Sequence, residues 1–311
     1  MSDVFHSGTV ALVGRPNVGK STFLNRVLGQ KLSITSPRPQ TTRNRVVGIV
    51  SQDSFQAVLI DTPGHHKAWS RLNRGMVKLA EQVLEEVDVI ALLVDLVPAV
   101  AQARAGKAVL SKGERVLVEH IQRSGKPCVL ALNKVDAVEV DWVLPVIDAW
   151  RAAHDFAAIV PMSAFKDADA ARVMEAVAAL LPEGPALFPT DQLTEGSERF
   201  FVTEIIREKM FRRLRDELPY SVAVQIEQFD EDNRDSDRPR VIIYARILVE
   251  RRSQKGIVIG KGGATLKAIG TDARKDIERM LGCAVHLELH VSISEDWTRN
   301  PRVLRELGIE R

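Results

Sequence analysis

Short apolar runs recur along the first part of the chain, and polar or amphipathic segments separate them. A continuous apolar run of four to eight residues is typical of a strand that is covered on both faces, as in a parallel sheet. Such strands are predicted at 9–13, 46–50, 57–60, 88–95, 127–132 and 157–162. Helical periodicity between them predicts helices at 22–28, 72–86, 114–124, 138–154 and 169–181. This alternation indicates an α/β fold, with a mostly parallel sheet between helices.

The pattern changes after residue 181. Residues 182–199 contain three prolines and two glycines without sustained periodicity, which predicts a linker between domains 1–181 and 200–311. The second domain is predicted to be a smaller α+β fold, with a loop of acidic residues at 230–237. Its helices are expected at 200–217 and 264–281, with a short helical or turn segment at 256–259, and its strands at 220–229, 241–249 and 284–291.

Composition adds only broad limits. The hydrophobic fraction of 45%, the charged fraction of 27% and the net charge of +2 are ordinary for a soluble protein. The first seven residues lack the features of a signal peptide, and the most apolar stretch contains Asp88 and Asp95, which argues against a membrane span. Cys128 and Cys283 are expected to be buried, reduced thiols. We expect a cytoplasmic protein.

The first candidate site is a phosphate-binding loop between a predicted strand and a predicted helix. Residues 14–21, GRPNVGKS, match the pattern G-x-x-x-x-G-K-[ST] at every fixed position. In such a loop glycines let the backbone N–H groups approach a polyphosphate, the lysine contacts the β- and γ-phosphates, and the serine hydroxyl binds Mg²⁺. The nucleotide-binding residues predicted here are Gly14, Arg15, Pro16, Asn17, Val18, Gly19, Lys20, Ser21 and Thr22.

Two later segments are candidates to sense the γ-phosphate. The polar loop at 33–44 contains Thr41 and Thr42, and we expect Thr42, with Thr41 as the second choice, to give a hydroxyl to Mg²⁺. The next strand delivers an Asp-Thr-Pro-Gly turn, in which Asp61 is expected to hold Mg²⁺ through water and the N–H of Gly64 to reach the γ-phosphate. Either segment alone would be an ordinary loop or turn. Thr62 and Pro63 complete the predicted nucleotide-binding turn.

A third motif predicts the base. Asn133-Lys134-Val135-Asp136 follows a buried strand, and the two carboxylate oxygens of Asp136 match the N1–H and N2–H₂ donors of guanine. Asn133 is expected to support the loop and reach N7, and the stem of Lys134 to cover the base. At the end of the next strand, Ser163 and Ala164 are assigned to the same site, with the Ala164 N–H bonding guanine O6.

The second domain carries a Gly260-Lys261-Gly262-Gly263 loop between two predicted helices. The element order is that of a type II KH domain, whose G-x-x-G loop clamps single-stranded nucleic acid. A glycine turn with a solvated basic face is the alternative. The predicted RNA-binding residues are Gly260, Lys261, Gly262, Gly263, Lys255 and Lys267, and Arg251, Arg252, Arg274 and Lys275 could extend an electrostatic track.

Taken together, these motifs resemble the Era family of translation-factor-related GTPases. The resemblance covers GRPNVGKS, PQTTR, DTPG, NKVD and SA, then VIGKGG, the stretches at 197–220 and 273–276, and the closing segment 297–308 with its LRELG. The sequence is similar to that family over almost the whole chain. Other GTPases share the first half, so the second half is what distinguishes Era. Three positions depart from the family pattern: His65 after the turn, the segment at 96–112, which is long and whose role is unassigned, and Phe165.

The resemblance implies a slow GTPase switch that uses GTP, GDP and Mg²⁺. Lys20, Thr42 and Gly64 are the expected catalytic residues, with Ser21, Thr42 and Asp61 at the metal and K⁺ activation inferred at Asn17. The family partner is the 3′ region of small-subunit ribosomal RNA, during maturation of the small ribosomal subunit. A monomer is expected, in the cytoplasm and with a peripheral membrane contact left open.

Two rival functions remain at this stage. One is a regulatory nucleotide sensor whose second domain docks protein and whose hydrolysis is incidental. The other, weaker, is an adenine-nucleotide enzyme. The water-orienting group is unassigned, and the neighbouring pair His65 and His66 gives only a weak metal signal, so we expect solvated histidines there.

Overall fold

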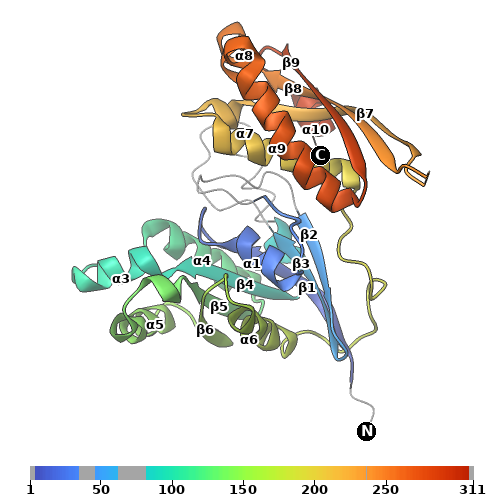
Figure 1. The fold of residues 1–311 in the computed structure, drawn as a ribbon. Coiled ribbons are helices and arrows are strands. Elements are labelled where there is room, and N and C mark those ends of the chain that lie inside the picture. Colours follow the sequence, from blue (N-terminus) through green and yellow to red (C-terminus); the bar gives the residue numbers. More distant parts are fainter. Residues whose placement is uncertain (1–3, 35–45, 62–81, 236, 308–311) are drawn as a thin grey trace. The chain divides into compact units, whose positions relative to one another are not determined.

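The computed structural model describes residues 4–34, 46–61, 82–235 and 237–307. The chain forms two compact units, residues 1–195 and 196–311. Each is built around its own sheet (Figure 1). Each also has its own core of buried apolar side chains.

The first unit contains a six-stranded sheet in the order β2-β3-β1-β4-β5-β6. Strand β2 runs antiparallel to β3, and the other neighbouring pairs are parallel. The predicted mostly parallel sheet is therefore confirmed, and the carboxyl ends of its central strands share one edge, where such sheets bind ligands. The strands are β1 (His6–Val13), β2 (Val46–Ser51), β3 (Phe55–Asp61), β4 (Val89–Asp95), β5 (Cys128–Asn133) and β6 (Ala158–Met162).

Helices pack on both faces of this sheet (Figure 1). The core of the unit is a cluster of buried aliphatic side chains from β1, β4 and β5 together with Trp150, which is fully buried. The helices described in this unit are α1 (Lys20–Val27), α3 (Leu96–Arg104), α4 (Lys112–Ser124), α5 (Val143–Arg151) and α6 (Asp167–Ala178).

Two helical predictions need correction. The segment at 96–112, for which the periodicity predicts no helix, begins with the nine-residue helix α3, and the Asp95 side chain caps it by accepting from the Val97 N–H at 2.9 Å. The single helix predicted at 138–154 is shorter, because α5 begins at Val143. Pro145 lies in the first turn of α5, where its missing N–H costs nothing, whereas a helix starting at 138 would place it in the interior.

Most of the predicted linker is hydrogen-bonded to the first unit. The Ser7 N–H donates to the Pro182 carbonyl at 3.0 Å, and the Ile49 N–H donates to the Leu193 carbonyl at 2.8 Å. The Gln56 side chain, fully buried, accepts from the backbone N–H groups of Leu187 and Phe188 at 2.7 and 2.9 Å. These bonds, with an isolated antiparallel bridge between Glu183 and His6 of β1, satisfy the backbone of an otherwise irregular segment.

The second unit consists of a three-stranded sheet, β7-β8-β9, with helices packed against it. Strand β7 is antiparallel to β8, and β8 is parallel to β9. The chain order of helix, two strands, helix, glycine loop, helix and strand agrees with the predicted type II KH arrangement. The elements are α7 (Glu198–Arg213), β7 (Ala223–Asn233), β8 (Arg240–Val249), α8 (Arg252–Ile259), α9 (Ala264–Leu281), β9 (Ala284–Ile293) and α10 (Pro301–Glu306).

Strand β7 is longer than predicted. It includes Asp230–Asn233, which the sequence assigned to a loop of acidic residues. Because β7 is an edge strand with irregular pairing after Asp230, acidic side chains can project from it into solvent without disturbing the core.

The two cysteines differ in environment. Cys128 is buried in β5, and that burial raises the pKa of its thiol to about 12. Cys283 is only half-buried, so the prediction that both are buried is wrong for this one. Both thiols are free. Across the described ranges we find no helix whose length and apolar character suffice to cross a membrane.

Candidate functional site

The phosphate-loop motif lies between β1 and α1, and two of its glycines are required by close backbone approach. Gly14 has φ of 147°, and a Cβ there would lie 2.3 Å from the Leu93 carbonyl oxygen. Gly19 has φ of 106°, and a Cβ there would lie 2.2 Å from Nδ2 of Asn133. No side chain fits at either position, so the loop is packed directly against the ends of β4 and β5.

Lys20, the first residue of α1, is folded back over the loop. Its Nζ donates to the carbonyl oxygens of Gly14 at 3.1 Å and Arg15 at 3.2 Å, and the residue is buried. Burial lowers the pKa of this ammonium, and the nearby charge of Asp61 counteracts that shift. The ammonium is thus held at the centre of the loop by bonds that a phosphate oxygen can replace.

Asp61 ends β3 beside Ser21 and forms an oxygen-rich corner. Its Oδ2 accepts from Ser21 Oγ at 2.7 Å and from Ser33 Oγ at 2.9 Å. Its Oδ1 is buried and has no hydrogen-bond partner in the part of the chain that the structure describes. Burial raises the pKa of this carboxyl group, while Lys20 and the two serines oppose the rise.

This corner fits a magnesium ion. Carboxylate and hydroxyl oxygens are hard donors of the kind that Mg²⁺ takes, and the unpartnered buried oxygen of Asp61 is a group that a cation would satisfy. A bound Mg²⁺ would neutralise charge on phosphate oxygens here. The other predicted ligand, Thr42, lies outside the described residues.

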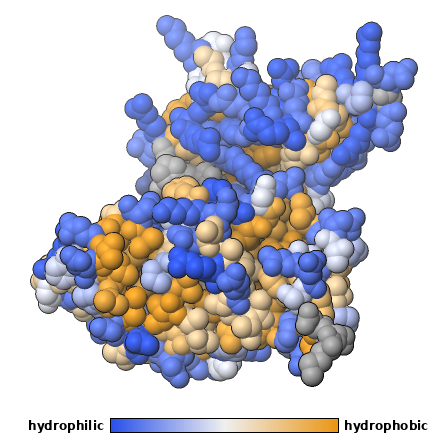
Figure 2. Space-filling model, turned by 60° about the horizontal axis from the view of Figure 1, so that its bottom comes forward, coloured by the Kyte–Doolittle hydropathy of each residue, from blue (hydrophilic) through white to orange (hydrophobic). Residues whose placement is uncertain are grey.

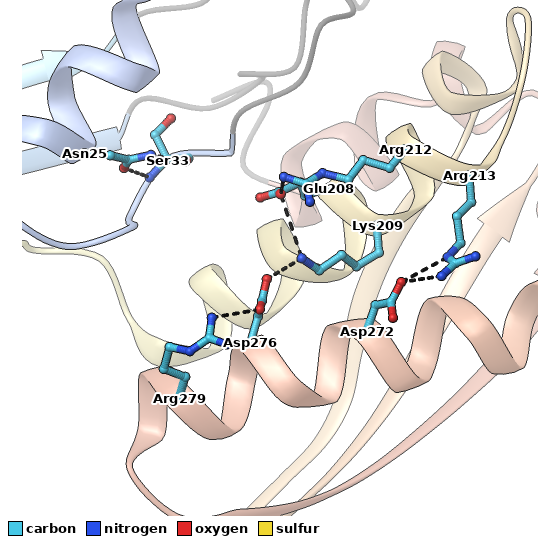
Figure 3. Close-up of polar contacts among 9 residues, drawn as sticks. All are labelled: Asn25, Ser33, Glu208, Lys209, Arg212, Arg213, Asp272, Asp276 and Arg279. Carbon is cyan, nitrogen blue, oxygen red and sulfur yellow. Dashed lines mark hydrogen bonds and ion pairs between the residues drawn. The ribbon is translucent and has the colours of Figure 1, made fainter. Parts of the chain in front are cut away.

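Ser33 belongs to this corner although no motif marked it. Its backbone is fixed by Asn25 of α1, whose Oδ1 accepts from the N–H groups of Leu32 at 2.9 Å and Ser33 at 2.8 Å. Asn25 Nδ2 also donates to the Ser33 carbonyl at 2.8 Å, and the pair is drawn in Figure 3. Asn25 thereby places a second hydroxyl on Asp61, a role that depends on a turn in space and left no pattern in the sequence.

Asn133 joins three loops of the candidate base site. Its Nδ2 donates to the Val18 carbonyl in the phosphate loop at 2.7 Å. Its Oδ1 accepts from the N–H groups of Lys134 at 2.8 Å and Ala164 at 2.9 Å. The supporting role expected of Asn133 is visible in this geometry, and the second N–H of Nδ2 is the group that would serve guanine N7.

The backbone N–H of Ala164 is already bonded to Asn133. The predicted bond from this N–H to guanine O6 would therefore have to be shared with Asn133 Oδ1. Ser163 is buried, and its N–H donates to Asp169 Oδ2 at 2.8 Å, which fixes the end of β6 against the start of α6.

The remaining predicted base contacts lie just beyond β5. Lys134 adopts a left-handed backbone conformation, φ of 67°, and its Nζ contacts Asp95 Oδ2 at 2.5 Å. Its stem therefore extends from the end of β5 toward the end of β4. Asp136 follows in a short 3₁₀ turn, Val135–Ala137, and is exposed, so its carboxylate is accessible to a ligand.

Several predicted residues cannot be placed. Thr62, Pro63 and Gly64, together with Thr41, Thr42, His65 and His66, fall outside the described residues. Within 4–34, 46–61, 82–235 and 237–307, no group of three or more His, Cys, Asp or Glu side chains is arranged to hold a metal.

The glycine loop of the second unit is a separate candidate site. Gly260, Gly262 and Gly263 have φ of 75°, 59° and 80°. A Cβ at Gly260 would lie 2.2 Å from Thr265 Oγ1, whereas Gly262 and Gly263 face open space. Together with exposed Lys261, this leaves an open backbone surface of the kind that can approach a nucleic-acid chain.

The predicted basic track does not form one cluster around that loop. Lys255 on α8 and exposed Lys267 on α9 flank it, but Lys275 lies about 18 Å further along α9 at 1.5 Å per residue. In the view of Figure 2 the second unit presents mostly hydrophilic side chains. An apolar residue that the sequence reading did not mark, Ile257, is 58% exposed on α8 close to the loop.

Both units of the chain match known protein families. Residues 9–134 match a family described as 50S ribosome-binding GTPase, and residues 217–298 match the KH domain family. The chain is 46% identical over 306 residues to GTPase Era of Geotalea daltonii, covering 98% of both chains. It is 47% identical over 309 residues to GTPase Era of Geobacter metallireducens, covering 99% of both.

Two solved structures are similar over the full length. A variant of Aquifex aeolicus Era bound to GDP·AlF4⁻ superposes with a TM-score of 0.90 at 37% identity, covering 99% of this chain and 100% of that one. The same values hold for Era in complex with MgGDPNP and nucleotides 1506–1542 of 16S ribosomal RNA.

Proposed function

This chain belongs to the Era family of GTPases, and on that premise we propose that it is a GTP-driven switch for small-subunit ribosomal RNA. It binds GTP at the edge of the first unit's sheet and hydrolyses it to GDP and phosphate. Its second unit binds RNA near the 3′ end of the small-subunit ribosomal RNA and assists maturation of that subunit.

The observation that carries the nucleotide half is the convergence of Lys20, Ser21 and Asp61 beside a loop closed by two glycines. Lys20 and the loop N–H groups stabilise negative charge that develops on the transferred phosphoryl group, and Lys20 reaches it by exchanging its bonds to the Gly14 and Arg15 carbonyls for bonds to phosphate oxygens. Ser21 and Asp61 hold Mg²⁺ and so fix the phosphates. Thr42 and Gly64 complete the site when GTP is bound.

Selection of guanine rests on Asp136. Asp136→Asn exchanges one acceptor oxygen for a donor, so the variant is expected to bind xanthosine triphosphate better than GTP. Competition between the two nucleotides, measured for wild type and variant, tests this assignment. An unchanged preference for GTP would remove Asp136 from the base site, and a preference for ATP would support the adenine-nucleotide alternative.

RNA binding rests on the Gly260–Gly263 loop and its flanking lysines. The related Era structure holds nucleotides 1506–1542 of 16S ribosomal RNA, and this chain aligns with it over both units. We expect the double variant Lys261→Asp, Gly262→Asp to lose binding of that RNA while its GTPase rate stays unchanged. Unchanged RNA binding would instead favour the rival function, a second unit that docks protein.

GTP binding in the first unit is coupled to RNA binding in the second. GTP orders the loops around Thr42 and Gly64, and that ordering changes the affinity of the second unit for RNA. RNA affinity measured with a non-hydrolysable GTP analogue and with GDP tests it, since equal affinity in both states excludes coupling.

Finer assignments follow from the family. K⁺ activation is proposed at Asn17, whose φ of 64° turns the backbone at the centre of the phosphate loop; GTPase rates in K⁺ and Na⁺ test it. A monomer and a peripheral membrane contact are proposed on the resemblance alone, and light scattering and co-sedimentation with vesicles test them.

A further inference from the structure

The second unit contains a charged pocket that the glycine loop does not use. It has a volume of about 190 Å³ and lies between α7 and α9. At about 30 Å³ per water molecule it has room for roughly six waters, enough for a phosphate group. In Figure 3, Lys209 and Arg213 of α7 reach toward Asp276 and Asp272 of α9. The lining residues of the pocket are Lys209, Arg212, Arg213, Asp272, Lys275, Asp276 and Arg279.

The base of the pocket is a buried lysine. The side chain of Lys209 is only 6% exposed, and its Nζ contacts Asp276 and lies 3.8 Å from Glu208 Oε1. Asp276 also accepts from Arg279 at 3.1 Å. A buried ammonium is tolerated because carboxylates face it, so the pocket floor is a fixed, charged surface.

The rim of the pocket is formed by exposed cations. Arg212 pairs with Glu208 at 2.5 Å, and Arg213 forms an ion pair with Asp272. The side chains of Arg212 and Arg213 remain 51% and 40% exposed. Lys275 is exposed, and among the described residues no ion pair is found for it.

The charges do not balance. Five cations line the pocket, and two carboxylates of its lining together with Glu208 face them, which leaves an excess of two positive charges. Ion pairs that served only to join α7 to α9 would need no such excess and no open volume. Guanidinium groups with free N–H donors around such a space are the donors that bind phosphate in two-pronged geometry.

We propose that this pocket binds a backbone phosphate of the same RNA whose other nucleotides occupy the Gly260–Gly263 loop. The proposal rests on the proposed function. Lys275 lies about 18 Å beyond the loop along α9, so a phosphate bound there belongs to a nucleotide several positions along the RNA from those held at the loop. Exposed Lys267, Thr271 and Arg274 occupy the intervening surface of α9. The pocket therefore extends the RNA site rather than duplicating it.

Truncated RNA tests the proposal on the full-length protein. RNA with the sequence of nucleotides 1506–1542 is shortened stepwise from each end, and its Kd is measured for wild type and Lys275→Gln with a non-hydrolysable GTP analogue. Lys275→Gln is expected to weaken binding of the long RNA about fivefold. The slope of log affinity against log salt concentration is expected to become shallower by about 0.7. Below a certain RNA length, wild type and variant are expected to bind equally.

Matched variants keep the result interpretable. Lys107→Gln and Arg238→Gln each remove one exposed positive charge outside the pocket and should leave RNA binding unchanged. Asp272→Asn removes a carboxylate from the pocket and should increase the affinity for the long RNA. If the ion pair of Asp272 were only structural, its loss would not increase RNA affinity. GTPase rate and thermal midpoint are measured for every variant to confirm folding.

Three results would overturn the proposal. The first is an equal loss of RNA affinity in Lys275→Gln and in the control variants. The second is a loss of affinity in Lys275→Gln that is the same for the shortest RNA as for the longest, which would place Lys275 at the loop. The third is unchanged RNA binding with reduced binding to phosphatidylglycerol vesicles, which would assign the pocket to lipid. Failure of the proposed function is distinguishable, because Lys261→Asp, Gly262→Asp would then leave RNA of every length bound.

Discussion

Asn133 Nδ2 and the Val18 carbonyl oxygen lie 2.7 Å apart, and this hydrogen bond joins the guanine motif at the end of β5 to the phosphate loop. Asn133 is buried, and its Oδ1 accepts two backbone N–H groups, so one amide holds together the loops after β1, β5 and β6. The parts of the site assigned to base and phosphate are therefore one connected structure.

We expect Asn133→Asp and Asn133→Ala to separate the roles of this amide. Asp keeps the acceptor for the Lys134 and Ala164 N–H groups but loses the donor to Val18, whereas Ala loses all three bonds. Each unsatisfied buried group costs about 1–3 kcal/mol, and Asp also sets a carboxylate oxygen against the Val18 carbonyl, so both variants should unfold more easily and bind GDP more weakly than wild type. Urea unfolding and GDP titration check this, and wild-type GDP affinity in both variants would contradict it.

Gly19→Ala is expected to abolish nucleotide binding. The new Cβ would lie 2.2 Å from Asn133 Nδ2, so the loop or Asn133 must move. Gly106→Ala is the matched control, because Gly106 also has a positive φ, 63°, but faces open space. The control should cost about 1–2 kcal/mol of stability and bind GDP normally. If Gly19→Ala binds GDP as well as the control does, the loop accommodates the added Cβ and the overlap does not decide nucleotide binding.

Ser33→Ala is expected to raise the Mg²⁺ concentration needed for half-maximal GTPase activity by about 10-fold, because the variant no longer orients Asp61. GDP affinity without Mg²⁺ should change little. The exposed neighbour of β3, Ser54, provides the control variant Ser54→Ala. If Ser33→Ala lowers GTPase activity equally at all Mg²⁺ concentrations, Ser33 acts on folding rather than on the metal corner.

Cys128 gives a prediction for pH. Burial raises the pKa of its thiol from 9.0 to about 12, so the folded state keeps a proton that the unfolded state releases. Its contribution to stability is full below pH 9 and is lost as pH rises toward 12, at about 1.4 kcal/mol per pH unit. The difference in unfolding free energy between wild type and Cys128→Val should fall over that window, and a constant difference would refute the shift.

Reactivity gives an independent measurement of the same group. Since the thiolate is the reactive form, Cys128 should resist alkylation at pH 8 in the folded protein, whereas half-buried Cys283 should react. One thiol should therefore react before unfolding and two after it. Rapid alkylation of Cys128 in the native state would contradict its burial.

The sequence by itself determined the order of elements and the chemistry at the strand ends. Apolar runs of strand length between amphipathic segments are typical of a covered sheet, and the phosphate-loop pattern requires glycines where the backbone approaches a ligand. These are local properties, which depend on period, length and fixed residue spacing. For that reason α9 (Ala264–Leu281) has the bounds that its periodicity predicts.

The boundaries and the unmarked contacts were decided by tertiary structure. Residues 182–195 belong to the first unit, where buried Gln56 bonds the backbone of Leu187 and Phe188. Ser33 reaches Asp61, and Lys275 joins residues of α7, across separations that no short pattern encodes. Spacing along the chain specifies which groups are available, and only packing between distant segments decides which of them meet.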